Sequence, residues 1–590
     1  MNPDERYEAR AAAGPRLGLG LSGGGFRASF FHIGLLAQMA MLGLLRHVEV
    51  ISTVSGGSIL GAFYYLHVKR LLESKPDAAI EDRDYQALVE RIEHDFLEAV
   101  QRNIRMRTFL NPIKNLRMAF ANYSRSDRIG ELYDRYIYRP AVDPPPPTPI
   151  EMRALKIRPR GGREDFHPLR HNGDRRAKVP IILINATSLN TGHNWRFEAS
   201  RMGEPPQLDS VSRDIDKNFR LRRPPSYEQI IPKQQALGLG EAVAASACVP
   251  GLFHPLAISD LYPDDIRVQL VDGGVHDNQG IQALLDVGCT RFIVSDASGQ
   301  MEDEPDPATG LLSALPRSNT ILMARVREEE LSRLLDRSSH PVAFLHLRRG
   351  LAAQAVSWIG PDGRPAEQRK VERQPDAPSE SFQVAQPVQE LLSRIRTDLD
   401  SFTEVEAYSL MVDAYNMGRV ELPRAQAISE LIPAAPQIGA PRWRFLAIAP
   451  WLLHPTPRYE KQLRVGGQLA FKVFRLSPAV TVVTLGVLLA FLLGAWSQFR
   501  EPISRALSSS FTLGELLLLV LVLSLGFVPR LSRAFRSLDV LRAPSEFVFR
   551  LVVRALPSTL GSAFVWLHLA IFDRLFLRYG RISRLGPPPA

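Results

Sequence analysis

The chain has 590 residues, of which 45% are hydrophobic and 23% are charged. This composition excludes a chain that is disordered overall and leaves room for several average domains. The two cysteines, Cys248 and Cys289, are too few and too far apart for a disulfide framework or a Cys-x-x-Cys metal site. The polar first 16 residues predict no secretory signal.

The formal net charge of +10 would suit nucleic-acid binding, but its distribution points elsewhere. From Arg442 onward there are 19 Lys and Arg against 6 Asp and Glu, which leaves 53 of the 72 basic and 56 of the 62 acidic residues for the rest of the chain. The basic segment is also the most apolar one, a combination typical of membrane proteins. We therefore expect a bilayer as partner and no nucleic acid.

Short apolar runs alternate with helical patterns along residues 1–430 and predict an α/β domain. Its helical insert is expected at about 70–175. Polar and proline-rich loops are expected at 142–149 and 360–387. The predicted strands are Leu17–Leu21, Val48–Val54, Val179–Asn185, Arg267–Val271, Arg291–Asp296 and Val342–Leu347.

Residues 431–590 are expected to form a membrane-associated helical region. Two apolar runs, 477–496 and 511–529, are each long enough to cross a hydrocarbon core of about 30 Å. Basic residues outside both runs favour a hairpin with its two ends, and the catalytic domain, in the cytoplasm, which makes the protein a multi-pass membrane protein. Two buried core helices are the alternative. Residues 547–576 read as interfacial helices, with a third span left open.

The stretch "LGLGLSGGGFR" at 17–27 matches the dinucleotide fingerprint G-x-G-x-x-G, but its context argues against a nucleotide. The fingerprint glycines should follow a strand, whereas Gly18 and Gly20 alternate with leucines inside the predicted strand. The expected acidic residue about 20 positions later is also missing. Nucleotide binding stays only as a minor alternative.

The turn that follows this strand predicts an anion site. Gly23, Gly24 and Gly25 allow close backbone approach and several amides aimed at one point. A helix begins there, with Arg27 in its first turn, and helix N-termini attract anions. A tight strand–helix turn without a ligand is the alternative.

A second strand–turn–helix places Ser55 at the junction of "VEVISTV" and "GGSILGAF". This order is typical of a nucleophile elbow, which exposes a serine oxygen at a strand end between small neighbours. Gly56 and Gly57 fit this geometry, but Thr53 stands where glycine is usual. A structural helix cap is the other interpretation of Ser55.

The nucleophile would need a base. The run "VQLVDGG" places Asp272, followed by Gly273 and Gly274, at the end of another strand, at the same sheet edge as Ser55. Asp277 and Asn278 are expected only to close the turn after this motif. The candidate histidines for a triad, which lack persuasive local context, are His254, His276, His340 and His346.

Gly-Gly-Gly-x-Arg at 23–27, Ser-Gly-Gly at 55–57 and Asp-Gly-Gly at 272–274 together resemble the patatin-like phospholipases. Residues Ile184–Gly192, Ala245–Pro255 and Ile395–Met411 are similar to further segments of that family, so the resemblance covers about 17–415. It implies a three-layer α/β/α domain with a mostly parallel central sheet. The C-terminal transmembrane or interfacial helices lie outside it.

The resemblance also implies a Ser–Asp dyad without a histidine. Ser55 would attack the acyl ester of a phospholipid or lysophospholipid, and Asp272 would act as general base. The amides of Gly23, Gly24 and Gly25, helped by Arg27, would form the oxyanion hole. The family implies no metal and no other cofactor.

Three rival functions remain open. A degenerate site, suggested by Thr53, would leave a membrane-anchored binding or scaffold protein. A Ser-His-Asp hydrolase would need an essential histidine, and a nucleotide-dependent enzyme would need Gly20. Oligomeric state, head group and acyl chain are left undetermined by the sequence.

Overall fold

The computed structural model describes residues 15–118, 123–206, 219–299, 301, 303–336, 341–351, 356–361, 363–364, 382–436, 438–508 and 561–589. Within these residues, nine strands form one mixed sheet in the order β5-β4-β3-β2-β1-β8-β9, with β7 paired to β3 and β6 paired to β7. The strands are β1 Leu17–Leu21, β2 Val48–Val54, β3 Ile181–Ser188, β4 Asn194–Phe197, β5 Met202–Gly203, β6 Leu256–Ile258, β7 Val268–Asp272, β8 Arg291–Asp296 and β9 Val342–His346.

The centre of the sheet is parallel and its margin is antiparallel. Strands β3, β2, β1, β8 and β9 run in one direction, so their carboxyl ends share one edge. Strands β4 and β7 both pair antiparallel with β3. Strand β7 pairs only with the last three residues of β3, where Ala186 lies opposite Asp272. The predicted α/β class with a mostly parallel sheet is confirmed, and all six predicted strands are present. The short strands β4, β5 and β6 were not predicted.

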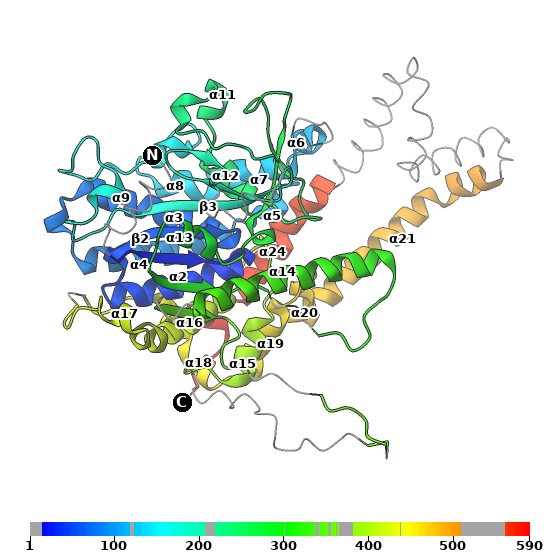
Figure 1. The fold of residues 1–590 in the computed structure, drawn as a ribbon. Coiled ribbons are helices and arrows are strands. Elements are labelled where there is room, and N and C mark those ends of the chain that lie inside the picture. Colours follow the sequence, from blue (N-terminus) through cyan, green and yellow to red (C-terminus); the bar gives the residue numbers. More distant parts are fainter. Residues whose placement is uncertain are drawn as a thin grey trace.

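Helices cover both faces of the sheet (Figure 1). One face carries α2, α3 and α16, with α4 packed on α2, and the other carries α13, which contacts β1, β2 and α14. Their bounds, with those of the other helices used below, are α2 Gly25–Met41, α3 Gly56–Ser74, α4 Asp82–Val100, α5 Ile104–Arg107, α6 Pro112–Arg117, α7 Arg125–Tyr133, α12 Leu239–Ser246, α13 Ile281–Asp286, α14 Leu311–Asp336, α15 Gln386–Ser393, α16 Glu404–Arg424, α18 Ala449–Leu453, α19 Pro457–Gly466, α20 Lys472–Leu476, α21 Pro478–Ser508 and α24 Asp573–Tyr579.

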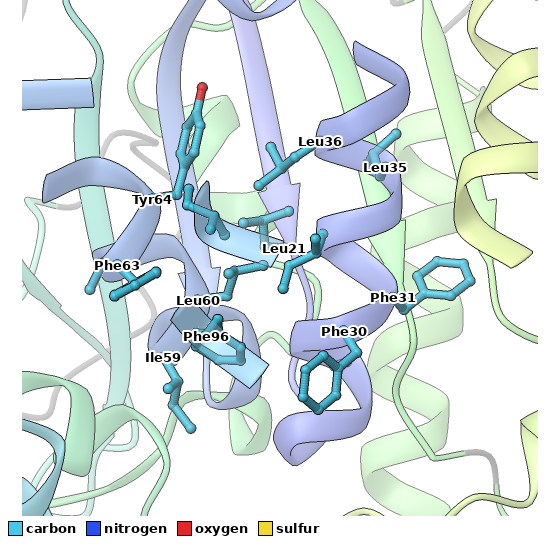
Figure 2. Close-up of a cluster of buried hydrophobic side chains, with 14 of the residues drawn as sticks. Leu21, Phe30, Phe31, Leu35, Leu36, Ile59, Leu60, Phe63, Tyr64 and Phe96 are labelled. Carbon is cyan, nitrogen blue, oxygen red and sulfur yellow. The ribbon is translucent and has the colours of Figure 1, made fainter. Parts of the chain in front are cut away.

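Aromatic rings from three helices fill the core above β1. Figure 2 shows Phe30 of α2, Phe63 of α3 and Phe96 of α4 gathered around Leu21. The Phe96 ring lies 5.7 Å from Phe30 and 5.6 Å from Phe63, both within the range of favourable ring pairs. This cluster fixes the two helices that begin at the glycine turns.

The glycines of the fingerprint-like stretch have a packing role on the opposite face. A Cβ at Gly18 would lie 2.9 Å from Cys289 Sγ and Leu284 Cδ2, and one at Gly20 would lie 2.9 Å from the Gln279 carbonyl oxygen. The alternation Leu-Gly-Leu-Gly-Leu thus gives β1 a leucine face toward α2 and a bare face toward α13.

The hydrophobic core continues beyond residue 430, where the sequence suggested a domain boundary. The main core cluster includes buried side chains from the segment between α16 and α20, whereas the chain becomes continuously apolar only near 477. The segment is amphipathic and contributes one face to this core, and the division at 430 stays a prediction. The buried residues are Trp443, Phe445, Ile448, Trp451, Leu452, Tyr459 and Leu463.

One described helix is long and apolar enough to cross a membrane. Residues Pro478–Gln498 of α21 have a mean hydropathy of 2.3, and none of this stretch is buried. Figure 1 shows α21 leaving the body of the protein. The predicted run at 477–496 falls on this helix, whereas the run at 511–529 lies outside the described residues.

Gly61 in α3 provides a test of the packing beneath the Ser55 turn. A Cβ at this position would collide with the Thr53 methyl group, so Gly61→Ala should lower the free energy of unfolding by about 1–3 kcal/mol. Adding Thr53→Ser removes that methyl and should restore most of the loss, because the Thr53 hydroxyl that donates to the Leu183 carbonyl is kept.

Denaturant unfolding of the full chain in detergent measures both variants. Gly173→Ala is the control, since a Cβ there meets nothing within 4 Å. A Gly61→Ala variant as stable as the Gly173→Ala control would contradict this packing.

Candidate active site

Ser55 occupies a sharp turn between β2 and α3. Its backbone angles, φ 48° and ψ −116°, are unusual for a residue with a side chain, and such strain costs about 1–3 kcal/mol. The turn is held from both sides: the Gly57 amide donates to the Ser22 carbonyl at 3.1 Å, and the Ser55 amide donates to Ser246 Oγ at 3.0 Å. A Cβ at Gly56 or Gly57 would collide with the backbone around Gly25 or Leu21, so both glycines are required.

Thr53, the departure from the usual elbow pattern, has a defined place. Its side chain is fully buried, its hydroxyl donates to the Leu183 carbonyl at 3.1 Å, and its methyl group fills the space left by Gly61. The threonine is therefore accommodated by a glycine one turn into α3, and the turn at Ser55 keeps its shape.

Asp272 ends β7 and has a rigid backbone. Its amide donates to the Cys248 carbonyl at 3.0 Å, and its carbonyl accepts from Thr187 Oγ1 at 2.9 Å. Its side chain accepts a hydrogen bond from the Gly274 amide at 2.8 Å, and the Ser55 hydroxyl lies close enough to lower the pKa of this carboxyl. The structure thus brings together two residues that are 217 positions apart, and both are nearly buried, with 6% of Ser55 and 5% of Asp272 exposed.

Burial sets the protonation behaviour of Asp272. Loss of solvent raises the pKa of this carboxyl from 3.8 to about 6, and the hydrogen bonds from the Gly274 amide and the Ser55 hydroxyl oppose the increase. At neutral pH the carboxylate is ionised yet is more basic than a solvated aspartate. That is the property required of a general base.

The glycine-rich turn lies beside Ser55. Gly24 and Gly25 have positive φ angles of 135° and 58°, which glycine adopts without strain. A Cβ on Gly23 would lie 3.2 Å from Ser55 Cβ, but the Gly23 amide already donates to the Asn278 carbonyl at 3.0 Å. Among the described residues, the amides of Gly24 and Gly25 have no hydrogen-bond acceptor. These two amides, rather than all three, are available for a ligand.

The side chain of Arg27 stabilises the turn by hydrogen bonds to backbone carbonyl groups of neighbouring segments. The side chain is buried, and it donates to the Ala297 carbonyl at 3.0 and 3.2 Å and to the Ile395 carbonyl at 2.6 Å. Burial is also the main cause that lowers its pKa to about 10. The guanidinium therefore binds the neighbouring segments at 297 and 395, and any help it gives to the oxyanion hole stays a prediction.

Two residues near the dyad were missed by the sequence analysis. Ser246 accepts from the Ser55 amide and lies 2.8 Å from Ser58 Oγ. It belongs to the "ASACVP" segment quoted for the family resemblance, which was the available signal. The buried hydroxyl of Tyr133 has no partner among the described residues, and burial followed by the Asp272 charge raises its pKa. No pattern in the helical insert distinguished this tyrosine.

The loop after Asp272 ties the site together. Asp277 accepts from the amides of Gln279, Gly280 and Gln282 at 2.8–3.0 Å, which closes the turn as expected. Asn278 does more than close it, because its carbonyl binds the Gly23 amide and its side chain lies where a Cβ of Gly23 or Gly274 would be. The Asp-Gly-Gly loop is thus fastened to the glycine-rich turn.

Other catalytic arrangements lack support in the described part of the chain. Neither Ser55 nor Asp272 has a histidine partner there. In the same residues, no group of three His, Cys, Asp or Glu side chains could hold a metal ion. His32, the histidine beneath the turn, contacts Ser295 Oγ and the Ser22 carbonyl, and burial lowers its pKa to about 4.

Comparison with known proteins agrees with this geometry. Residues 19–285 match the family model of patatin-like phospholipases. The chain contains a patatin-like phospholipase domain. The matched range includes the glycine-rich turn, Ser55 and Asp272. No curated protein matches the chain significantly.

Among solved structures, human GIVD cytosolic phospholipase A2 in complex with methyl gamma-linolenyl fluorophosphonate inhibitor and terbium chloride shows 14% identity and a TM-score of 0.34. That match covers 72% of this chain, which spans about 62% of the human protein's length. VipD from Legionella pneumophila shows 11% identity and a TM-score of 0.22, over 85% of this chain and 89% of VipD.

The raised pKa of Asp272 predicts a pH profile for the patatin-like domain. If ionised Asp272 takes the proton of Ser55, labelling of Ser55 by a fluorophosphonate should be fast above about pH 7. Protonation of the carboxyl should slow it tenfold per pH unit below about 6. Labelling rates of the full chain between pH 4.5 and 8.5 measure this. A flat profile over that range would contradict the assignment of Asp272 as the base.

Proposed function

We propose that the protein is a membrane-anchored serine acyl hydrolase that cleaves acyl esters of phospholipids or lysophospholipids. The observation that carries this proposal is the closeness of the Ser55 hydroxyl to the buried Asp272 carboxylate, whose pKa it lowers, beside the unpaired amides of Gly24 and Gly25. The patatin-like domain at 19–285 supports the reaction class. The exposed apolar helix α21 supports a lipid environment.

In the first half-reaction, Ser55 Oγ forms a bond to the ester carbonyl carbon while its proton moves to Asp272. The carbonyl oxygen becomes an oxyanion that the Gly24 and Gly25 amides stabilise, and the loss of one such donor typically costs about 2.7–4 kcal/mol. The bond to the lipid alcohol then breaks. The alcohol leaves with the proton from Asp272, and the acyl group stays on Ser55.

In the second half-reaction, water attacks the acyl carbonyl and gives its proton to Asp272. The same amides bind the new oxyanion, and the bond to Ser55 Oγ breaks. Ser55 regains its proton, and a fatty acid is released. Each proton that leaves a nucleophile passes through the one carboxylate, so the raised pKa of Asp272 serves both steps.

The dyad predicts a distinctive pattern in variants. Ser55→Ala should abolish fluorophosphonate labelling and vesicle lipid hydrolysis. Asp272→Asn should reduce hydrolysis by roughly 10³-fold or more while Ser55 stays in place. Fatty acid release from mixed phosphatidylcholine and phosphatidylglycerol vesicles measures the loss.

Asp277→Asn is the matched control, because an asparagine oxygen can still accept from Gln279 and Gly280. It should retain most of the activity. A wild-type chain that neither labels nor hydrolyses would favour the scaffold function instead. An essential histidine would favour a Ser-His-Asp hydrolase.

The geometry of the chain around α21 supports a hairpin in the membrane. Helix α20, which leads into α21, packs against α24, which follows the apolar region: Phe474 and Phe572 lie 5.1 Å apart, and Val473 and Phe576 share one cluster. The chain therefore leaves the folded domain and returns to it at one place. Two ends on one side of a bilayer require an even number of crossings, so a second crossing accompanies α21. The run at 511–529 is the candidate for it.

The helical segment at 561–579 fits an interfacial position. Phe564 and Trp566 are 60% and 64% exposed, while Val565 and Phe576 are buried against the domain. Ser562 accepts from Asn115 Nδ2 at 2.9 Å, which fixes this segment beside α6. An aromatic side chain with a polar edge, such as Trp566, prefers the membrane–water boundary.

The hairpin predicts that residues 499–510 and the catalytic domain lie on opposite sides of the membrane. Both native cysteines are buried, so an engineered cysteine should dominate labelling by a membrane-impermeant maleimide. In vesicles of one orientation, Ser504→Cys should react from the side that leaves Ser74→Cys protected. Detergent should expose both. Labelling of both from one side would contradict a crossing by α21.

A further inference from the structure

Residues 394–403, the segment that joins α15 to α16, contact the glycine-rich turn directly. The Phe26 amide donates to the Asp398 carbonyl at 3.0 Å. A Cβ at Gly25 would lie 2.7 Å from that carbonyl oxygen and 2.8 Å from the Asp398 nitrogen. Arg27 donates to the Ile395 carbonyl at 2.6 Å. The backbone of the turn that carries the two unpaired amides is therefore pressed against this segment.

The same segment contacts the helices that flank the membrane region. Asp400 accepts from Arg396 Nε at 2.7 Å and forms an ion pair with Lys472, the first residue of α20. The Lys472 ammonium also lies 4.2 Å from the centre of the Phe576 ring in α24. Asp573 of α24 binds the Ser401 hydroxyl and accepts from Asn103 Nδ2 at 3.0 Å. Both ends of the membrane region therefore meet residues 400–401.

The charges in this contact are buried and mutually dependent. The side chains of Asp400 and Lys472 are only 2% and 10% exposed. Burial alone would raise the pKa of Asp400, but the charges of Arg396, Lys472 and Arg105 outweigh it and hold the pKa below its usual value. Removing Lys472 would take away one of the three cations that compensate the buried Asp400 charge. Loss of Lys472 would therefore disturb Asp400, which lies two residues from the backbone that touches Gly25.

We propose that Lys472 is a positioning residue that acts through Asp400: it holds residues 394–403, and with them the Gly24 and Gly25 amides, in the geometry that Ser55 needs. The seating of the membrane helices and the reactivity of the serine are thereby linked. This inference rests on the proposed hydrolase function, and it extends that function to residues nearly 200 positions beyond the matched family range.

The test compares three variants of the full chain in lipid nanodiscs. Lys472→Met removes the charge and keeps the stem, Lys472→Arg keeps the charge, and Arg475→Met removes a charge from the exposed side of the same short helix. Lys472→Met should label with a fluorophosphonate about tenfold more slowly, and kcat for a soluble short-chain ester should fall by the same factor with KM unchanged. Lys472→Arg should recover most of the rate, and Arg475→Met should match the wild type.

Hydrogen exchange gives a readout that does not depend on activity. Amides of residues 23–30 should exchange faster in Lys472→Met than in Arg475→Met. A wild-type chain that neither labels nor hydrolyses defeats the proposed function, and the exchange result then decides the link alone. If the wild type reacts but Lys472→Met matches Arg475→Met in rate and exchange, the link is overturned. An equal loss in both variants overturns it as well, because lost charge near the bilayer would then suffice.

Discussion

The site depends on one close contact between two helix starts. The backbone of Gly56, where α3 begins, lies so close to the backbone of Gly25, where α2 begins, that Gly56 cannot hold a side chain, and the backbone of Asp398 excludes one at Gly25. This contact brings Ser55 beside the glycine-rich turn and aims the positive ends of two helices at the same region. A chain with any other residue at these positions would separate the nucleophile from the amides. The strained backbone of Ser55 persists because this contact, the Ser246 hydroxyl and the aromatic core beneath α2 and α3 leave it no alternative.

In the proposed Ser–Asp dyad, burial makes the aspartate carboxylate more basic than it would be in water. An exposed aspartate would be a weak base for a serine hydroxyl, but Asp272 is 5% exposed and burial raises its pKa to about 6. Arg27 donates to the backbone carbonyls of Ala297 and Ile395. Through these contacts the Arg27 guanidinium joins α2 to the segments at 297 and 395.

The sequence predicted those features that are local in the chain. Apolar runs gave the parallel strands, and the three glycine motifs gave the turns at their carboxyl ends, because strand polarity and glycine freedom are properties of short stretches. Contacts between residues far apart in the chain were not predicted from the sequence. Nothing local shows that the Gly23 amide is taken by Asn278, that Gly61 makes room for Thr53, or that Ser246 supports Ser55. The amphipathic helices up to 466 are a further example, because the surfaces they pack against, such as α16, lie elsewhere in the chain.

The chain that leads into α21, the proposed membrane helix, is continuous with the fold that carries the candidate site. Tyr459 and Leu463 of α19 lie in the main core, and the next helix begins at Lys472 inside the ion-pair cluster that also holds residues 396–406. A movement of α21 would therefore be transmitted to the glycine-rich turn through a short series of buried contacts. A flexible linker would hold the domain near lipid just as well, but it would not fix the orientation of the domain relative to the bilayer. Under the proposed function, this fully packed connection would fix how the sheet edge that carries Ser55 and Asp272 faces the bilayer, and a lipid would enter a site whose geometry depends on the seating of α21.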